Sequence, residues 1–170
     1  MKIFEVKLAK FTNNPLWTYH VQVPVTISAY FKKENQKRVL VTLNDVETFH
    51  AAILSDGDHY YFIYMNAQRR KKLNLKVGSI VKVKIEKDNS DYGMEMPEEL
   101  SEIFVMDTEA DKYFHALTPG KQRSLIYIVD KVKSPQKRIE KAIVITEHLK
   151  MLKGGLDYKL LQEGFRNFGK

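Results

Sequence analysis

Most of the candidate functional residues in this sequence are lysines and arginines. Eleven candidates for polyanion binding fall in two groups: Arg69, Arg70, Lys71 and Lys72, then Lys121, Arg123, Lys131, Lys133, Lys137, Arg138 and Lys141. Clustered cations attract a polyanion because binding releases its counterions, although contacts to phosphates carry no sequence information. For the run 69–72 a solvated surface is the simpler explanation, since four consecutive residues cover more than one face of a helix.

The second group contains a pattern that a helix would organise. At 100° per residue, Lys137, Lys141 and His148 share one stripe of an expected helix. Arg138 flanks this stripe near the helix N-terminus, where backbone N–H groups are free. Cations at that end oppose the helix dipole and cost up to about 1 kcal/mol each. A bound phosphate or carboxylate would relieve that cost, and so would acidic side chains of residues 95–111.

The net charge of +7 is unevenly distributed along the sequence. Residues 1–120 carry 16 Lys+Arg and 16 Asp+Glu, whereas residues 121–170 carry 12 and five. Between Glu86 and Asp111, ten acidic residues face one lysine. Two interpretations stay open: the acidic segment packs beside the basic helices, or those helices meet an external polyanion.

Enzyme motifs are missing from the sequence. Cysteine is absent, which excludes disulfides and thiolate chemistry. The five histidines do not have the spacing of preset metal ligands, and no nucleophile elbow or phosphate-binding loop occurs. We therefore expect a non-enzymatic protein with no catalytic residue, no metal site and no cofactor.

Aromatic residues near the N-terminus provide a candidate pocket. Trp17 and Tyr19 share one face of an expected strand, and His20 lies on the other face. These three residues could line a barrel mouth and hold a small ligand, although such a histidine is more often a hydrogen-bonded wall residue.

Hydrophobic periodicity divides the chain into a β-rich part and a helical part. Six strands are expected, at 2–11, 17–23, 38–43, 47–54, 59–65 and, after a turn at Gly78, in the last part of the stretch 75–88. Several of them have one apolar face, 59–65 is almost wholly apolar, and together they suggest closure into a small barrel. Short helices are expected at 26–33 and 67–75. After residue 97 the period becomes helical, with starts at Pro97, Asp107, Thr118-Pro119 and Ser134-Pro135. We predict an α+β fold, with a barrel over 1–91, a hinge near 89–96 and a basic helical region over 92–170.

Dispersed motifs give a family resemblance. The pattern Trp17-x-Tyr19-His20-x3-Pro24, then Leu75-x2-Gly78-x-Ile80-Val81-x-Val83, then Asp88, then Pro97-x2-Leu100 resembles the domain of unknown function DUF1905. The later Leu117-Thr118-Pro119-Gly120-Lys121, Lys133-Ser134-Pro135 and Lys137-Arg138-Ile139 resemble the YdeI or OmpD-associated (bacteriocin-protection) region. The resemblance implies a barrel with appended helices and no established reaction. At the level of fold alone, the element around Gly78 also resembles the swapped-hairpin barrels of AbrB-type regulators.

The N-terminus lacks the apolar run of a signal peptide, and no segment is long enough to span a bilayer, so a cytoplasmic location is expected. The leading hypothesis is a binding module for a polyanion such as nucleic acid. The alternatives are a stress-associated accessory protein that binds an acidic protein partner, and a small-ligand binder at the barrel mouth. Monomer and dimer stay open, since the Gly78 hairpin could exchange between chains.

Overall fold

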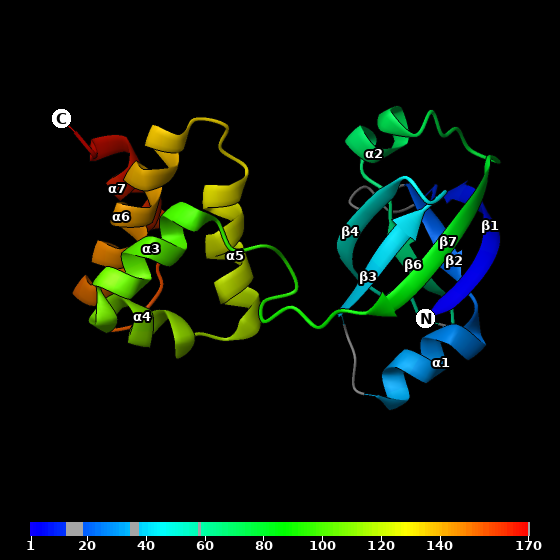
Figure 1. Ribbon diagram of the computed structural model, residues 1–170, viewed down its shortest axis with the longest axis horizontal. Coiled ribbons are helices and arrows are strands. Elements are labelled where there is room, and N and C mark those ends of the chain that lie inside the picture. Colours follow the sequence, from blue (N-terminus) through cyan, green and yellow to red (C-terminus); the bar gives the residue numbers. More distant parts are fainter. Residues whose placement is uncertain (13–18, 35–37, 58, 170) are drawn as a thin grey trace. The chain divides into compact units, whose positions relative to one another are not determined.

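The protein consists of two compact units, Met1–Asn89 and Ser90–Lys170 (Figure 1). The structure, a computed structural model, describes residues 1–12, 19–34, 38–57 and 59–169. The first unit is built on an antiparallel sheet and the second on packed helices, which confirms the predicted β-rich α+β fold followed by a helical region. Each unit has its own hydrophobic core.

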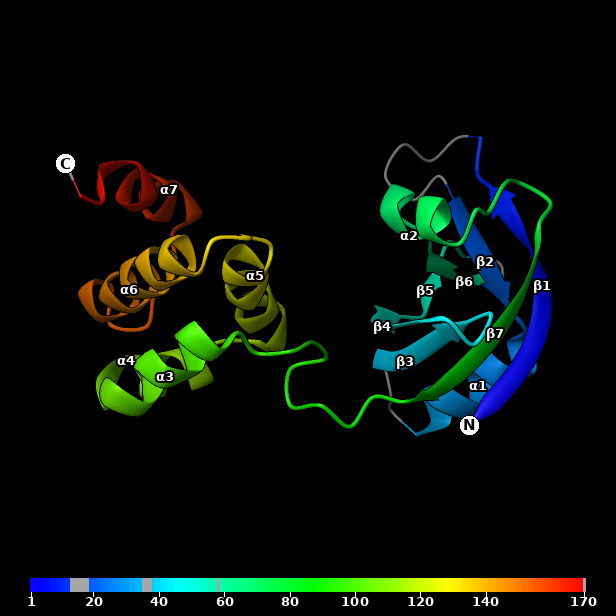
Figure 2. The same cartoon turned by 45° about the horizontal axis from the view of Figure 1, so that its top comes forward.

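The sheet of the first unit curls into a half-barrel (Figure 2). Its strand order is β4-β3-β7-β1-β2-β6-β5. The strands are β1 (Lys2–Lys10), β2 (Tyr19–Val23), β3 (Arg38–Leu43), β4 (Glu47–Ala52), β5 (Leu54–Ser55), β6 (Tyr61–Tyr64) and β7 (Ile80–Lys87). The six predicted strands all occur, and the predicted strand 47–54 is divided into β4 and β5. β4 and β5 are therefore the two edge strands of the sheet, although they follow each other directly in the chain.

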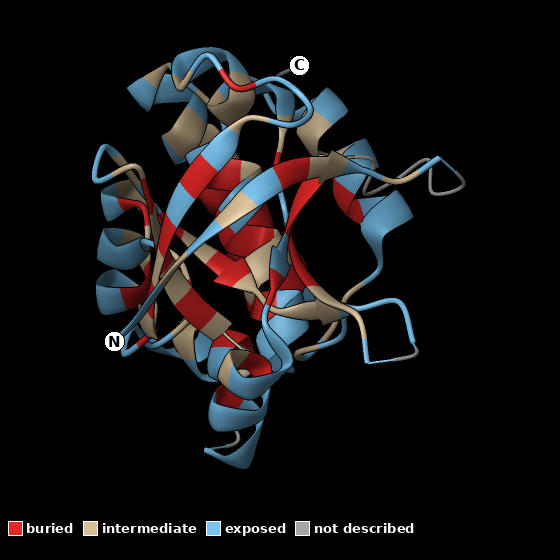
Figure 3. Ribbon diagram, turned by 90° about the vertical axis from the view of Figure 1, so that its right-hand side faces the viewer, coloured by how far each residue is buried: buried red, intermediate tan, exposed pale blue. Residues whose placement is uncertain are grey.

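Alternation of side chains explains why these segments pair. In β7 the residues Val81, Val83 and Ile85 are fully buried, whereas Lys82 points outward, and Figure 3 shows this alternation as red and pale blue. β7 pairs within its own chain, with β1 on one side and β3 on the other. The turn between β3 and β4 places Asn44 at a positive φ of 50°, which asparagine tolerates.

Two short helices lie at opposite ends of the half-barrel, α1 (Val25–Lys33) and α2 (Ala67–Lys72), in both views (Figure 1, Figure 2). From α1, Phe31 enters the core and is 1% exposed. The Asn66 side chain caps α2 by accepting a hydrogen bond from the Arg69 backbone N–H at 2.8 Å. Residues 13–18, which include the start of the strand expected at 17–23, lie outside the described residues.

The helical unit is organised around its longest helix. Its elements are α3 (Glu98–Met106), α4 (Thr108–His115), α5 (Pro119–Asp130), α6 (Pro135–Met151) and α7 (Tyr158–Asn167), and α6 packs against the other four. The predicted starts are present, with Pro97 acting as the N-cap of α3 rather than as its first residue. Asp107 caps α4 through Ala110 N–H at 3.0 Å.

The predicted polar stripe of α6 is partly wrong. His148, expected on this stripe, is buried together with Ile145, whereas Ile139 is 39% exposed. Because four helices surround α6, its buried surface is wider than a single amphipathic stripe. His148 accepts a hydrogen bond from the backbone N–H of Asp157 at 3.2 Å. The expected polar stripe of α6 therefore does not extend to His148.

Candidate functional site

The arginines of the run 69–72 pack against the half-barrel. The guanidinium carbon of Arg69 lies 3.6 Å from the ring centroid of Phe49, and that of Arg70 lies 3.5 Å from the ring of Tyr19. Such stacking stabilises a partly desolvated cation. Burial lowers the pKa of Arg69, and the nearby Glu47 opposes that shift. These arginines therefore help to cover one end of the half-barrel.

The two lysines of the same run differ from each other. The Lys72 ammonium forms an ion pair with Glu47. Lys71 is exposed on the short helix α2. Of the four cations predicted to meet a polyanion, Lys71 is thus the one that points to solvent without a stacking or ionic contact to another described residue.

Two of the three candidate pocket residues, Tyr19 and His20, are parts of a packed wall. His20 is 1% exposed and its ring stacks on Phe11 at 3.7 Å between centroids. Its Nε2 atom lies 2.8 Å from the Tyr60 hydroxyl. Tyr19 lies beneath the guanidinium of Arg70, and Trp17 lies outside the described residues. Tyr19 and His20 thus have packing partners, as the simpler interpretation of this histidine expected.

The distribution of charge changes when the chain is divided at its structural boundary. Residues 1–89 carry 15 Lys+Arg and eight Asp+Glu, and residues 90–170 carry 13 of each. The excess of +7 therefore belongs to the first unit, because the acidic segment after residue 90 is part of the helical unit. A division at residue 120 separates that segment from the basic helices with which it folds.

Part of the acidic segment neutralises the basic helices, as one of the two interpretations expected. Arg138 forms an ion pair with Glu99 at 3.7 Å. It also donates hydrogen bonds from Nε to the Val132 carbonyl at 2.6 Å and from Nη2 to the Asp130 carbonyl at 3.2 Å. Asp130 is the last residue of α5 and Val132 lies just beyond it, so the guanidinium sits at the C-terminal end of this helix, where a cation complements the helix dipole. Arg138 therefore fastens α6 to the end of α5.

Four lysines form a basic surface at the junction of α5 and α6. Lys131 and Lys133 lie in the turn and Lys137 in the first turn of α6; all three are exposed, and Lys141 follows one helical turn later. We call these four residues the α5–α6 basic surface. Burial lowers the pKa of Lys141, and the positive charge of Lys131 lowers it further. Lys131 and Lys141 are therefore close enough to repel each other.

A cavity adjoins this surface. Its volume is about 230 Å³, and it is lined by Lys137, Glu140, Lys141, Val144, Phe165 and Phe168. The Lys141 ammonium lies 4.0 Å from the ring centroid of Phe165, and Phe168 is 42% exposed. Lysines and aromatic rings thus lie together at this cavity. The sequence feature that could have predicted this arrangement is the pair Phe165 and Phe168 near the C-terminus, because α7 packs on α6 and brings both rings close to the lysines.

The remaining predicted cations are dispersed. Lys121 is exposed near the N-terminus of α5, at the opposite end of that helix from the α5–α6 turn. Arg123 donates from Nη1 to the Tyr92 carbonyl at 3.5 Å. The structure therefore assembles four of the eleven predicted residues into one surface and uses several others in packing.

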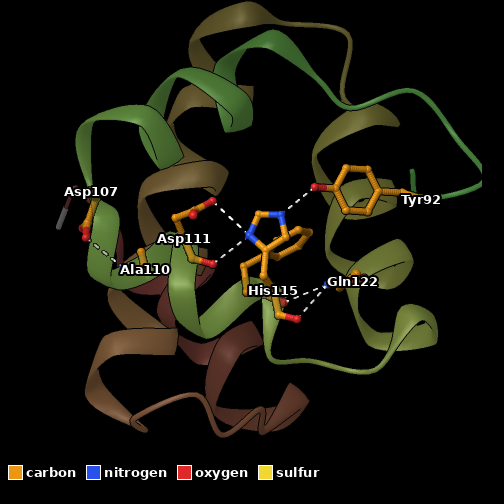
Figure 4. Close-up of polar contacts among 7 residues, drawn as sticks. Tyr92, Asp107, Ala110, Asp111, His115 and Gln122 are labelled. Carbon is orange, nitrogen blue, oxygen red and sulfur yellow. Dashed lines mark hydrogen bonds and ion pairs between the residues drawn. The ribbon is translucent and has the colours of Figure 1, made fainter. Parts of the chain in front are cut away.

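A hydrogen-bonded chain of three side chains was not anticipated from the sequence. The His115 Nδ1 atom lies 3.0 Å from both the carboxylate and the backbone carbonyl of Asp111, and Nε2 lies 2.8 Å from the Tyr92 hydroxyl (Figure 4). Both Asp111 oxygens can only accept, so Nδ1 carries a proton. In the neutral ring Nε2 then accepts from the Tyr92 hydroxyl. The spacing of Asp111 and His115 at i, i+4 on α4 was the available signal.

Two searches for other kinds of site gave negative results. Within the described ranges, no group of three or more His, Cys, Asp or Glu residues is arranged to hold a metal ion. Among the described helices, none is both long and apolar enough to cross a membrane.

Comparisons with known proteins assign both parts of the chain. Residues 4–85 match the model of the domain of unknown function DUF1905, and residues 93–150 match the model described as bacteriocin-protection, YdeI or OmpD-associated. No curated protein and no solved structure matches the chain significantly. The order and identity of the two regions confirm the resemblance seen in the sequence. The chain is thus similar to a DUF1905 domain over residues 4–85 and, after it, to the bacteriocin-protection, YdeI or OmpD-associated family over residues 93–150.

Proposed function

We propose that the protein is a non-enzymatic binding module that holds a polyanion, with single-stranded nucleic acid as the best fit, on the α5–α6 basic surface. The observation that supports this proposal is the cluster of three exposed lysines beside Lys141, whose pKa is lowered by burial and by Lys131. A phosphate bound there would stabilise the protonated lysines and release counterions.

The adjoining cavity supports a single strand over a duplex. Phe168 is 42% exposed at the cavity that Lys137 and Lys141 line. An exposed ring gives an unpaired base a stacking partner, whereas the bases of a duplex are already stacked. Lysines would contact the phosphates and the ring would contact a base, without reading its identity.

The test is a titration of fluorescently labelled oligonucleotides, single-stranded and duplex, followed by fluorescence anisotropy at several salt concentrations. The full chain is compared with a triple variant, Lys131→Gln, Lys137→Gln and Lys141→Gln. Loss of three phosphate contacts should reduce the slope of log affinity against log salt by about 2, at about 0.7 per contact for a single strand. The variant should also bind more weakly at low salt.

The control removes the same charge from the first unit through Lys7→Gln, Lys33→Gln and Lys76→Gln, all at exposed positions. If binding depends on the overall charge of the protein, both triple variants lose affinity equally and the assigned surface is wrong. Wild-type protein that shows no salt-sensitive binding to any oligonucleotide contradicts the function itself. Partners captured equally well from nuclease-treated lysate would instead favour an acidic protein as ligand.

A further inference from the structure

The helical unit contains a second cavity, distinct in residues and in charge from the α5–α6 basic surface. Its volume is about 510 Å³, which is within the range of small-molecule sites. It is lined by Asp91, Tyr92, Met96, Ser101, Phe104, Val105, Thr108, Asp111 and His115. These residues come from the segment before α3, from α3 itself and from α4, so the cavity lies wholly within the helical unit.

The lining combines apolar and polar groups. Met96, Phe104 and Val105 provide an apolar wall, and Val105 is 80% exposed. The polar residues include two carboxylates, Asp91 and Asp111, and no lysine or arginine is among the lining residues. Cavities of this composition bind the body of a ligand through apolar contact and fix its orientation through a few polar groups.

The segment that carries Asp91 and Tyr92 is anchored rather than free. The Tyr92 ring packs edge-on against Phe114 at 5.7 Å between centroids. Its hydroxyl is fixed by His115 at 2.8 Å, and its carbonyl accepts a hydrogen bond from Arg123. The predicted hinge at 89–96 therefore contains a residue fixed to α4 and α5, which gives this side of the cavity a defined shape.

The electrostatic character of the cavity is negative. The pKa of Tyr92 is raised, first by burial and then by the charges of Asp91 and Asp111, so the phenol keeps its proton. Arg123, which is not a lining residue, donates a hydrogen bond to the backbone carbonyl of Tyr92 at 3.5 Å. A neutral phenol ring beside two carboxylates offers a cation both charge attraction and a ring face.

We propose that this cavity binds a small organic ammonium ion with an apolar or aromatic body. The ammonium lies between the Asp91 and Asp111 carboxylates beside the Tyr92 ring, and the apolar body contacts Met96, Phe104 and Val105. His115 is a positioning residue here, because it holds the Tyr92 hydroxyl and is itself held by Asp111. The binding involves no covalent step.

The experiment uses the full chain and three matched probes: 2-phenylethylammonium, 2-phenylethanol and phenylacetate. Binding is followed by chemical-shift changes of the backbone amides in a two-dimensional NMR titration to about 10 mM probe, the range of weak fragments. We expect the ammonium to bind more tightly than the alcohol by about tenfold, and the carboxylate to bind least. The shifted amides should be those of residues 91–96 and of α3 and α4.

Two variants then test the assigned groups. Asp91→Asn removes one charge at an exposed position and should weaken ammonium binding about fivefold while leaving the alcohol within about twofold. Val105→Lys places a cation on the exposed apolar wall and should abolish ammonium binding. Asp130→Asn, exposed on α5 and outside the lining, is the control and should change nothing.

Three outcomes would overturn the proposal. One is equal affinity for the ammonium and the alcohol in the wild-type protein. Another is unchanged ammonium affinity in both Asp91→Asn and Val105→Lys. The third is the absence of shift changes around the cavity in a protein whose spectrum shows that it is folded. None of these results bears on nucleic-acid binding, because that proposal depends on different residues.

Discussion

The two units use their basic residues in opposite ways. The half-barrel unit holds the whole charge excess, yet its two adjacent arginines stack on Phe49 and Tyr19, and several of its lysines form ion pairs, such as Lys82 with Asp45 and Lys87 with Glu34. The helical unit has no net charge but gathers four lysines at the junction of α5 and α6. The net charge of a unit therefore does not identify a candidate binding surface; what identifies it is whether the individual basic side chains already have acidic or aromatic partners.

The largest expected effect tests whether the two cores are independent. Phe114 is fully buried in the helical unit and packs on Phe104 at 4.6 Å between ring centroids. Phe114→Ala should cost the helical unit about 3–5 kcal/mol, because it removes a large buried ring and leaves a cavity. Denaturant unfolding followed by Trp17 fluorescence for the first unit and by helical circular dichroism for the second measures each separately.

The matched variant for the first unit is Phe31→Ala, which removes a ring that is 1% exposed from the core of the half-barrel. If the cores are independent, Phe31→Ala shifts the fluorescence transition and Phe114→Ala shifts mainly the circular dichroism transition. Equal shifts of both signals in either variant would show that the units unfold together and would break the comparison.

The next effect tests whether the arginines of α2 are structural. Arg70→Ala should destabilise the first unit by about 1–2 kcal/mol, because it removes the stacked guanidinium and the packed stem over Tyr19. The neighbouring Lys71→Ala, at an exposed position, should change stability by less than about 0.5 kcal/mol. Both are measured by the Trp17 transition, and similar values for the two variants would contradict the structural role.

The helices and strands could be predicted from the sequence, but the basic surface between α5 and α6 could not. The alternation in β7 and the helix start at Asp107 are local patterns, and each predicted an element that the structure contains. The contacts that decide which cation is free are not local. Arg70 meets Tyr19, 51 residues earlier, and Lys141 meets Phe165, 24 residues later, so no helix periodicity could reveal either pairing.

The face of α6 illustrates the same limit. Helical periodicity at 100° per residue predicts burial only for a helix with one buried side, and on that assumption His148 lies with the solvated lysines. Because α6 is surrounded by four helices, burial is decided by the tertiary arrangement, and His148 becomes a core residue that bonds to the start of α7. The Tyr92–His115–Asp111 chain was missed for a related reason, since Tyr92 lies 23 residues before His115.

His148 provides a pH-dependent test within the helical unit. Burial lowers the pKa of His148, while Asp157 opposes the shift, and the neutral ring accepts the Asp157 backbone N–H. The lowered folded-state pKa means that the stabilisation is complete above the unfolded value near 6.5 and is lost as the pH falls below it. The slope is at most about 1.4 kcal/mol per pH unit.

The measurement for His148 is the unfolding free energy of the helical unit between neutral and mildly acidic pH, compared with His148→Gln. The glutamine variant has no titrating ring, so its stability should fall less over the same interval. The fluorescence transition of the half-barrel reports the first unit, in which His148 does not take part. Parallel loss in wild type and His148→Gln would show that another group controls the pH response.

The smallest expected effect separates two roles of Asp107 in joining the acidic and basic parts of the helical unit. Its carboxylate caps α4 and forms an ion pair with Lys150 at 2.8 Å, and the Lys150 ammonium is the first cause of its lowered pKa, followed by the Ala110 N–H. Asp107→Ala should cost about 1 kcal/mol because the cap is lost. Asp107→Asn retains the cap and loses only the charge, so it should cost less, since exposed ion pairs contribute little.

The lowered pKa of Asp107 means that its charge stabilises the helical unit above the unfolded-state pKa of 3.8, and that this stabilisation is lost as the pH falls through the folded-state pKa. Denaturant unfolding of both variants therefore decides the point: equal costs would mean that the ion pair, and not the cap, holds α4 to α6, and that charge pairing in this unit is stronger than its exposed surface suggests.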